Sequence, residues 1–75
     1  MELWIRSQDK MVLTRNVGLR IVIEQEGASI IDETNDYILG MYNTEKRALE
    51  ILNEIQNILI DYKNMSRVVY EMPKE

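Results

Sequence analysis

Cysteine and histidine are both absent from this chain of 75 residues. Without cysteine there are no disulfides or thiolate ligands, and without histidine a zinc site would need carboxylates alone. A catalytic nucleophile would have to be Ser, Thr or Lys activated by a carboxylate, and no motif indicates one. We therefore expect no metal, no cofactor and no catalytic residue. A nucleotide-cleaving enzyme is the least favoured class of function.

Long apolar runs are absent too. No stretch approaches the roughly 18 consecutive apolar residues of a membrane-spanning helix, and the first residues lack the basic patch and apolar run of a signal peptide. We expect a cytoplasmic protein with no membrane contact.

The short length favours self-association. One domain, residues 1–75, is the most this chain can form, and a domain of this size buries only about 60% of the surface it exposes when unfolded. Small domains gain stability from disulfides, metals or oligomerisation. Since the first two are excluded, we expect a homo-oligomer.

The net charge of −4 is unevenly distributed. Residues 1–20 contain four basic and two acidic side chains, whereas residues 24–36 contain five acids and no base. An acidic chain repels duplex phosphate, so direct DNA binding is not expected. The arginines of the first half can still hold a small anionic ligand. Alternatively, the acidic region 24–36 can bind a basic surface of a partner protein.

Period-2 hydrophobicity and turn residues predict five strands in the first half of the chain, at about 2–6, 11–15, 18–25, 28–32 and 37–42. Their connections are too short for parallel crossovers, so a five-stranded antiparallel meander is expected. The period then becomes 3.6, which predicts a helix over about 44–63, with Asn43 or Thr44 as its N-cap and Lys63-Asn64 at its end. A short final strand follows at 67–70. The fold class is α+β.

Both faces of this sheet contain apolar residues. The face toward the helix is expected to hold Leu3, Ile5, Leu19, Ile21, Ile23, Ile30, Leu39 and Met41. The second face receives Trp4, Arg6, Val12, Thr14, Arg20, Val22, Ile31, Ile38 and Tyr42. It is too apolar to be simply solvated, which indicates an interface or ligand surface; partial cover by the C-terminal strand is the alternative.

The helix is apolar over more than one face. Ala48, Ile51, Leu52, Ile55, Ile58, Leu59 and Tyr62 form an arc wide enough to cover one sheet. Leu49 and Ile60 lie outside that arc, either as scattered surface residues or as a second contact. We predict that Trp4, Leu49 and Ile60 contribute to an oligomer interface.

Guanidinium groups match phosphate oxygens and aromatic rings stack on bases, which makes a nucleotide-like ligand the chemistry these residue types favour. The candidate ligand-binding residues are Trp4, Arg6, Arg15, Arg20, Tyr37, Tyr42 and Arg47. The competing interpretation is that each arginine is solvated or ion-paired and that Trp4 only packs.

Two segments carry a resemblance. The opening residues 3–10, which include Trp4-Ile5-Arg6-Ser7-Gln8-Asp9, and residues 39–56, which include Tyr42-Asn43-Thr44-Glu45-Lys46-Arg47-Ala48-Leu49-Glu50, resemble a group of small phage and prophage proteins of Gram-positive bacteria. The match covers about a third of the chain. The resemblance implies an accessory phage protein that acts against host defence. Such a protein either binds a host protein or sequesters a nucleotide-derived immune signal, such as an ADP-ribose derivative or a cyclic nucleotide, in an oligomeric sponge without catalysis.

Overall fold

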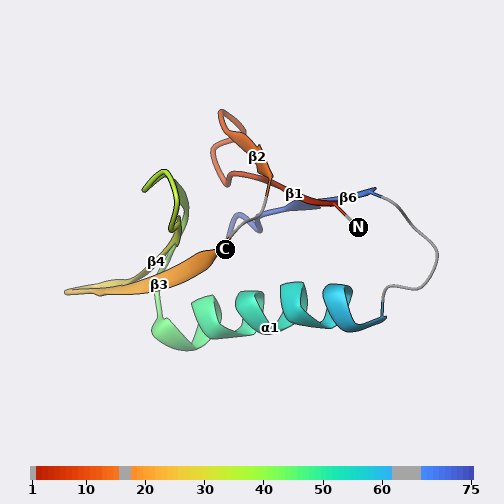
Figure 1. The fold of residues 1–75 in the computed structure, drawn as a ribbon. Coiled ribbons are helices and arrows are strands. Elements are labelled where there is room, and N and C mark those ends of the chain that lie inside the picture. Colours follow the sequence, from red (N-terminus) through yellow and green to blue (C-terminus); the bar gives the residue numbers. More distant parts are fainter. Residues whose placement is uncertain (1, 16–17, 62–66) are drawn as a thin grey trace.

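The computed structural model describes residues 2–15, 18–61 and 67–75 of the chain (Figure 1). Its elements, in chain order, are β1 (Glu2–Arg6), β2 (Leu13–Arg15), β3 (Leu19–Glu24), β4 (Gly27–Asp32), β5 (Ile38–Tyr42), α1 (Glu45–Asp61) and β6 (Arg67–Glu71). The fold is α+β, with two three-stranded sheets. Sheet A has the strand order β2-β1-β6, and sheet B has the order β3-β4-β5. None of the described helical residues form a helix long and apolar enough to cross a membrane.

The single five-stranded meander is therefore wrong, although three of its four antiparallel strand pairs are present. The pairs β1–β2, β3–β4 and β4–β5 are all antiparallel, but the described strands β2 and β3 belong to different sheets. The predicted final strand exists as β6, and it pairs with β1 in parallel. Parallel pairing is possible here because the whole chain from β2 to α1 provides the crossover.

The helix agrees with its sequence pattern. Thr44 is the N-cap, because its Oγ1 accepts a hydrogen bond from the Arg47 backbone N–H at 3.1 Å. Ala48, Ile51 and Ile55 form the buried stripe. Leu59, predicted on this stripe, is 45% exposed. The predicted helix end at residues 63–64, and the ring of residue 62, lie outside the described residues.

The core differs from its prediction most clearly on β5. Leu3, Ile5, Ile30 and Leu39 are buried as expected, whereas Met41 is exposed and Tyr42, assigned to the second face, is buried. The cause is a β-bulge, because Ile30 pairs with Gly40 and Ile31 pairs with Ile38. Leu39 is thus an extra residue that shifts the alternation of β5 by one.

Two further assignments were wrong in sheet B. Ile31 is buried because β4 is the central strand of the sheet and is covered on both faces. Ile23 is 64% exposed. It lies near the tip of the β3–β4 hairpin, which extends past the first turn of α1 (Figure 1).

The two sheets share one hydrophobic core, to which both contribute side chains. The Gln8 backbone N–H, just after β1, donates to the Leu39 carbonyl of β5 at 2.7 Å. The Thr14 hydroxyl of β2 donates to Asp32 Oδ2 of β4 at 3.1 Å. These bonds connect sheet A to sheet B, so one face of sheet A is directed inward and the other outward.

Candidate functional site

The outer face of sheet A contains the strongest candidate site. Leu3, Ile5 and Tyr70 point inward and are buried. Since side chains alternate along a strand, their neighbours point outward. The outer face of sheet A is accordingly formed by Glu2, Trp4, Arg6, Leu13, Arg15, Arg67, Val69 and Glu71.

The strand register places an aromatic ring at the centre of this face. Trp4 is directly opposite Arg15 of β2 and Val69 of β6, so these three side chains form one row across the sheet. Trp4 is half-buried, whereas Leu13 and Val69 are 51% and 54% exposed. Together with Arg67 they line an open hollow of about 360 Å³.

One carboxylate holds two of the arginines beside this ring. Arg67 Nε donates to Glu2 Oε1 at 3.1 Å, and Arg15 Nη1 is 4.0 Å from Glu2 Oε2. The hydrogen bond from Arg67 is the main reason why the pKa of Glu2 lies below its usual value, with smaller contributions from both positive charges. The exposed guanidinium groups are thus positioned without being buried.

The outer face of sheet A is positively charged although the chain is acidic. Arg6 Nε donates to the Lys10 carbonyl at 2.9 Å, and Lys10 Nζ bonds Glu71 Oε1 at 2.8 Å. The face and its adjoining turn thus combine Lys10 and the three arginines of β1, β2 and β6 with three carboxylates, those of Glu2, Asp9 and Glu71, which leaves a net charge of one positive unit. This local excess of positive charge attracts an anion.

The indole N–H of Trp4 is a further polar group at this face. Its Nε1 is shielded from solvent and makes no hydrogen bond of acceptable geometry with any described residue. This N–H also lowers the pKa of the nearby Glu2 carboxylate, but its effect is the smallest of those that act on Glu2. A buried donor left unpaired costs about 1–3 kcal/mol.

The other predicted ligand residues lie elsewhere. Arg20, on β3, is 3.9 Å from Glu33, and Tyr37 is 48% exposed in the loop before β5. Tyr42 is only 4% exposed, so its ring presents no free face for stacking. Arg47 donates through Nε to the Glu75 carbonyl at 2.9 Å. Of the predicted set, the structure brings Trp4, Arg6 and Arg15 together on the outer face of sheet A. Tyr42 and Arg47 line a separate hollow of about 360 Å³, beside Lys74 and Glu75.

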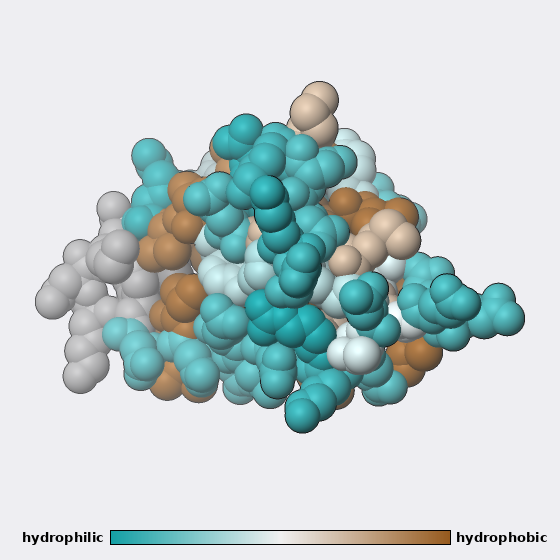
Figure 2. All heavy atoms as spheres, turned by 180° about the vertical axis from the view of Figure 1, so that it is seen from behind, coloured by the Kyte–Doolittle hydropathy of each residue, from teal (hydrophilic) through white to brown (hydrophobic). Residues whose placement is uncertain are grey.

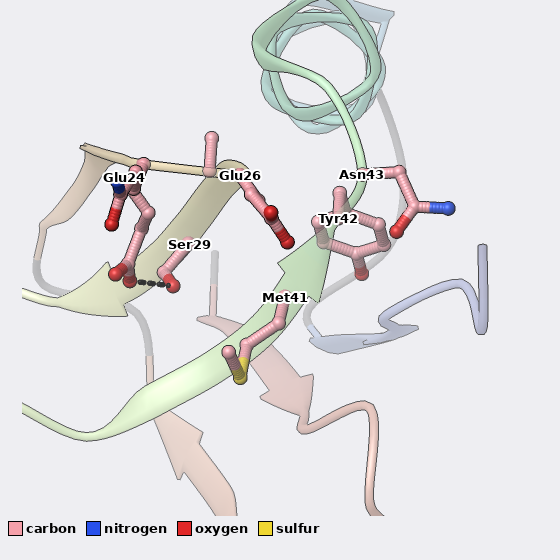
Figure 3. A pocket seen from close by; sticks show the side chains of 8 residues that line it. Glu24, Glu26, Ser29, Met41, Tyr42 and Asn43 are labelled. Atoms are coloured by element: carbon pink, nitrogen blue, oxygen red, sulfur yellow. Dashed lines mark hydrogen bonds between the residues drawn. The ribbon is translucent and has the colours of Figure 1, made fainter.

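A second hollow, of about 510 Å³, lies between the β3–β4 hairpin and the end of β5 (Figure 3). Its polar groups include Glu24 and Glu26, and its wall includes Tyr42. Glu24 Oε1 accepts a hydrogen bond from the Ser29 hydroxyl at 2.6 Å. Figure 3 shows Met41 and Tyr42 leaving β5 on different sides, as their exposed and buried states require.

The acidic region 24–36 is partly used within the fold. Asp32 is 2% exposed and accepts bonds from the Thr34 N–H, the Asn35 amide and the Thr14 hydroxyl. Glu33 faces Arg20. Fewer free carboxylates therefore remain for a basic partner than the sequence suggests.

Apolar groups on the helix are exposed but dispersed. Leu49 is 45% and Ile60 is 66% exposed, consistent with their position outside the buried stripe. Figure 2 shows that apolar side chains on the rear face lie in separate patches among hydrophilic ones.

Three of the four side chains that line the hollow beside Trp4 were missed from the sequence: Leu13, Arg67 and Val69. Arg67 and Val69 are more than sixty positions from Trp4, and only the parallel β1–β6 pairing brings them next to it. The signal available in the sequence was the strand Arg67–Glu71, which is flanked by opposite charges.

No protein-family model, no curated protein and no solved structure matches this chain. The proposal of a function therefore rests on the geometry of the outer face of sheet A.

Proposed function

We propose that this protein is a phage accessory protein that binds and sequesters a nucleotide-derived host immune signal as a homo-oligomer, without catalysis. It acts in the cytoplasm of the infected bacterium. The ligand is of the ADP-ribose or cyclic-nucleotide type, and the outer face of sheet A is its binding surface.

The observation that carries this proposal is the row formed by Arg15, Trp4 and Val69, with Arg67 lining the same hollow. An indole ring that stacks on a base contributes about 1–3 kcal/mol. Guanidinium groups on both sides of the ring suit the phosphates attached to that base, because their N–H groups bind phosphate oxygens in pairs.

The Glu2 carboxylate competes with the ligand for the arginines of this surface. It contacts both Arg67 and Arg15, so it competes with a phosphate for the N–H donors of these two guanidinium groups. A phosphate group offers more charge and more acceptor oxygens than a carboxylate, which favours the phosphate. Glu2 thus positions the arginines in the free protein and limits the affinity for the ligand.

The test is thermal stability with a panel of ADP-ribose derivatives and cyclic dinucleotides. A ligand at about a hundred times its dissociation constant stabilises the fold by about 2.7 kcal/mol. Arg15→Gln and Arg67→Gln should each weaken binding. Arg20→Gln is the matched control, because that arginine lies on β3 beside Glu33.

Two outcomes separate the alternatives. Recovery of the ligand intact after heating the complex supports sequestration, whereas a cleaved product would indicate an enzyme. If no member of the panel stabilises the protein and a basic host protein is captured instead, the acidic hollow beside Glu24 and Glu26 becomes the functional surface. The protein would then be an inhibitor of that host protein.

A further inference from the structure

The free edge of β6 has a charge pattern that is complementary to itself. The strand reads Arg67-Val68-Val69-Tyr70-Glu71, with a cation at one end and an anion at the other. Both charged side chains are well exposed, Arg67 by 70% and Glu71 by 65%. Among the described residues β6 pairs with β1 only, so its other edge is unpaired.

The hydrogen-bond phase of β6 shows which backbone groups are directed to that edge. The Met72 N–H donates to the Arg6 carbonyl at 3.0 Å, so Met72 faces β1. Successive residues of a strand direct their N–H and C=O groups to opposite sides. Val68 and Tyr70 therefore also face β1, whereas Arg67, Val69 and Glu71 direct their backbone groups outward.

We propose that two copies of this chain pair antiparallel through β6, about a two-fold axis that passes between the two Val69 residues. In this register Val69 faces Val69 of the second copy, and Arg67 faces its Glu71. All three outward residues then exchange both backbone hydrogen bonds with their partners, about six bonds in total.

The charges alternate in sign across the joined sheet. Glu2 bonds Arg67 within one copy, Arg67 meets Glu71 of the second copy, and that Glu71 lies next to Arg6 of its own β1. Unlike charges directly opposite each other on neighbouring strands stabilise the pairing, whereas like charges oppose it. A parallel arrangement or a shift by two residues would lose this complementarity.

The β6 pairing would join the proposed ligand-binding surfaces of two copies into one. This consequence rests on the proposed function. Trp4 is directly opposite Val69, so the two Trp4 side chains and the two Val69 side chains fall in one row, with an Arg15 at each end. The two β1 strands are three strand spacings apart, about 14 Å. A ligand with two base-like groups and phosphates between or beside them fits such a row.

Charge reversal tests the register by sedimentation at micromolar concentration. The wild-type protein should be a dimer, with twice the 8.9 kDa mass of the chain. Glu71→Arg places two arginines opposite each other at both ends of the interface, and Arg67→Glu places two glutamates there. Each single variant should therefore be monomeric. An equimolar mixture of the two should form a heterodimer, because every opposed pair again has unlike charges.

Val69→Pro is an independent variant directed at the backbone. It removes an outward N–H and leaves the bonds of Val68 and Tyr70 to β1 in place, so it should give a folded monomer with unchanged circular dichroism. Val69→Thr, which keeps the N–H, is the matched control and should remain dimeric.

A wild-type monomer would overturn this proposal, and so would a dimer that both charge reversals leave intact. Dissociation by Leu49→Lys and Ile60→Lys alone would also overturn it by assigning the interface to α1. Dimerisation is measured without ligand, so a β6-paired dimer that binds no nucleotide would refute the proposed function only. A monomer that binds nucleotide would refute the pairing only.

Discussion

The side-chain amide of Gln8 pairs with the backbone of Met41 as a neighbouring strand would. Gln8 Oε1 accepts from the Met41 N–H at 2.9 Å, and Gln8 Nε2 donates to the Met41 carbonyl at 3.1 Å. The same Nε2 also approaches the carbonyls of Pro73 at 3.2 Å and Lys74 at 2.6 Å. One side chain thus fastens the end of β1 to β5 and to the C-terminal tail.

Gln8→Glu should destabilise the fold by about 1–3 kcal/mol, the cost of leaving polar groups unpaired. A carboxylate still accepts from the Met41 N–H, but it cannot donate to the three carbonyl oxygens around it. Urea unfolding gives the free energy. Gln56→Glu, on the exposed side of α1, is the control and should change stability by less than about 0.5 kcal/mol.

Gly27→Ala should cost about 1–3 kcal/mol, because Gly27, the first residue of β4 after the β3–β4 turn, has a φ of 110°. An added Cβ would also meet the Tyr42 carbonyl oxygen, which is backbone and cannot move aside easily. Gly18→Ala is the matched control, because the Cβ there meets only the flexible Glu33 side chain. Equal unfolding midpoints for the two variants would contradict this explanation.

Acid should destabilise the protein through Asp32. Burial alone raises the pKa of Asp32, but the hydrogen bonds from Thr34, Asn35 and Thr14 outweigh it and hold the pKa below its usual value. The ionised Asp32 therefore adds to the free energy of unfolding above the unfolded pKa of about 3.9. This stabilisation is lost as the pH falls through the lower pKa of the folded protein.

Asp32→Asn should lower stability at neutral pH by about 1–3 kcal/mol and flatten its decline below pH of about 4. Unfolding measured as a function of pH checks both. Asp36→Asn is the control, since Asp36 is exposed and its φ of 59° suits asparagine. A steeper acid dependence in Asp32→Asn than in the wild type would refute this role.

Alkaline pH should destabilise the protein by ionising two buried phenols, those of Tyr42 and Tyr70. Burial raises the pKa of Tyr42 to about 12 and that of Tyr70 to about 12, with Glu54 adding to the effect at Tyr70. Because the pKa of each phenol is higher in the folded than in the unfolded protein, the neutral phenols stabilise the fold below the unfolded pKa of about 10. This stabilisation is lost as the pH rises through about 12. Tyrosinate absorbance should show two groups ionising near pH 12, and Tyr42→Phe and Tyr70→Phe should each remove one.

Local patterns predicted the elements of this fold, and long-range pairing decided their arrangement. The strand at Glu2–Arg6 and the helix cap at Thr44 follow from alternation and from capping chemistry. The separation into two sheets depends on β6 returning beside β1, for which no local pattern exists. The burial of Tyr42 depends on the bulge at Leu39, which strict alternation cannot anticipate.

The candidate site was predictable only in part for the same reason. The outward direction of Trp4 and Arg6 followed from the alternation of β1, and both lie on the outer face of sheet A. Thr14, predicted on the same face, is instead opposite the inward Ile5. Arg67 was hidden by its distance in sequence. Arg20 and Arg47 have the right chemistry for a phosphate, but the fold places them beside Glu33 and the Glu75 carbonyl.

Trp4 is the only tryptophan of the chain, so its fluorescence reports on the outer face of sheet A without a label. The most direct measurement is a titration of this fluorescence with the ADP-ribose derivatives and cyclic dinucleotides. Our account predicts a saturable change with at least one of them, weaker in Arg15→Gln, stronger in Glu2→Gln and unaltered in Arg20→Gln. Unchanged fluorescence across the whole panel, or a change that Arg15→Gln and Arg67→Gln leave intact, would contradict it.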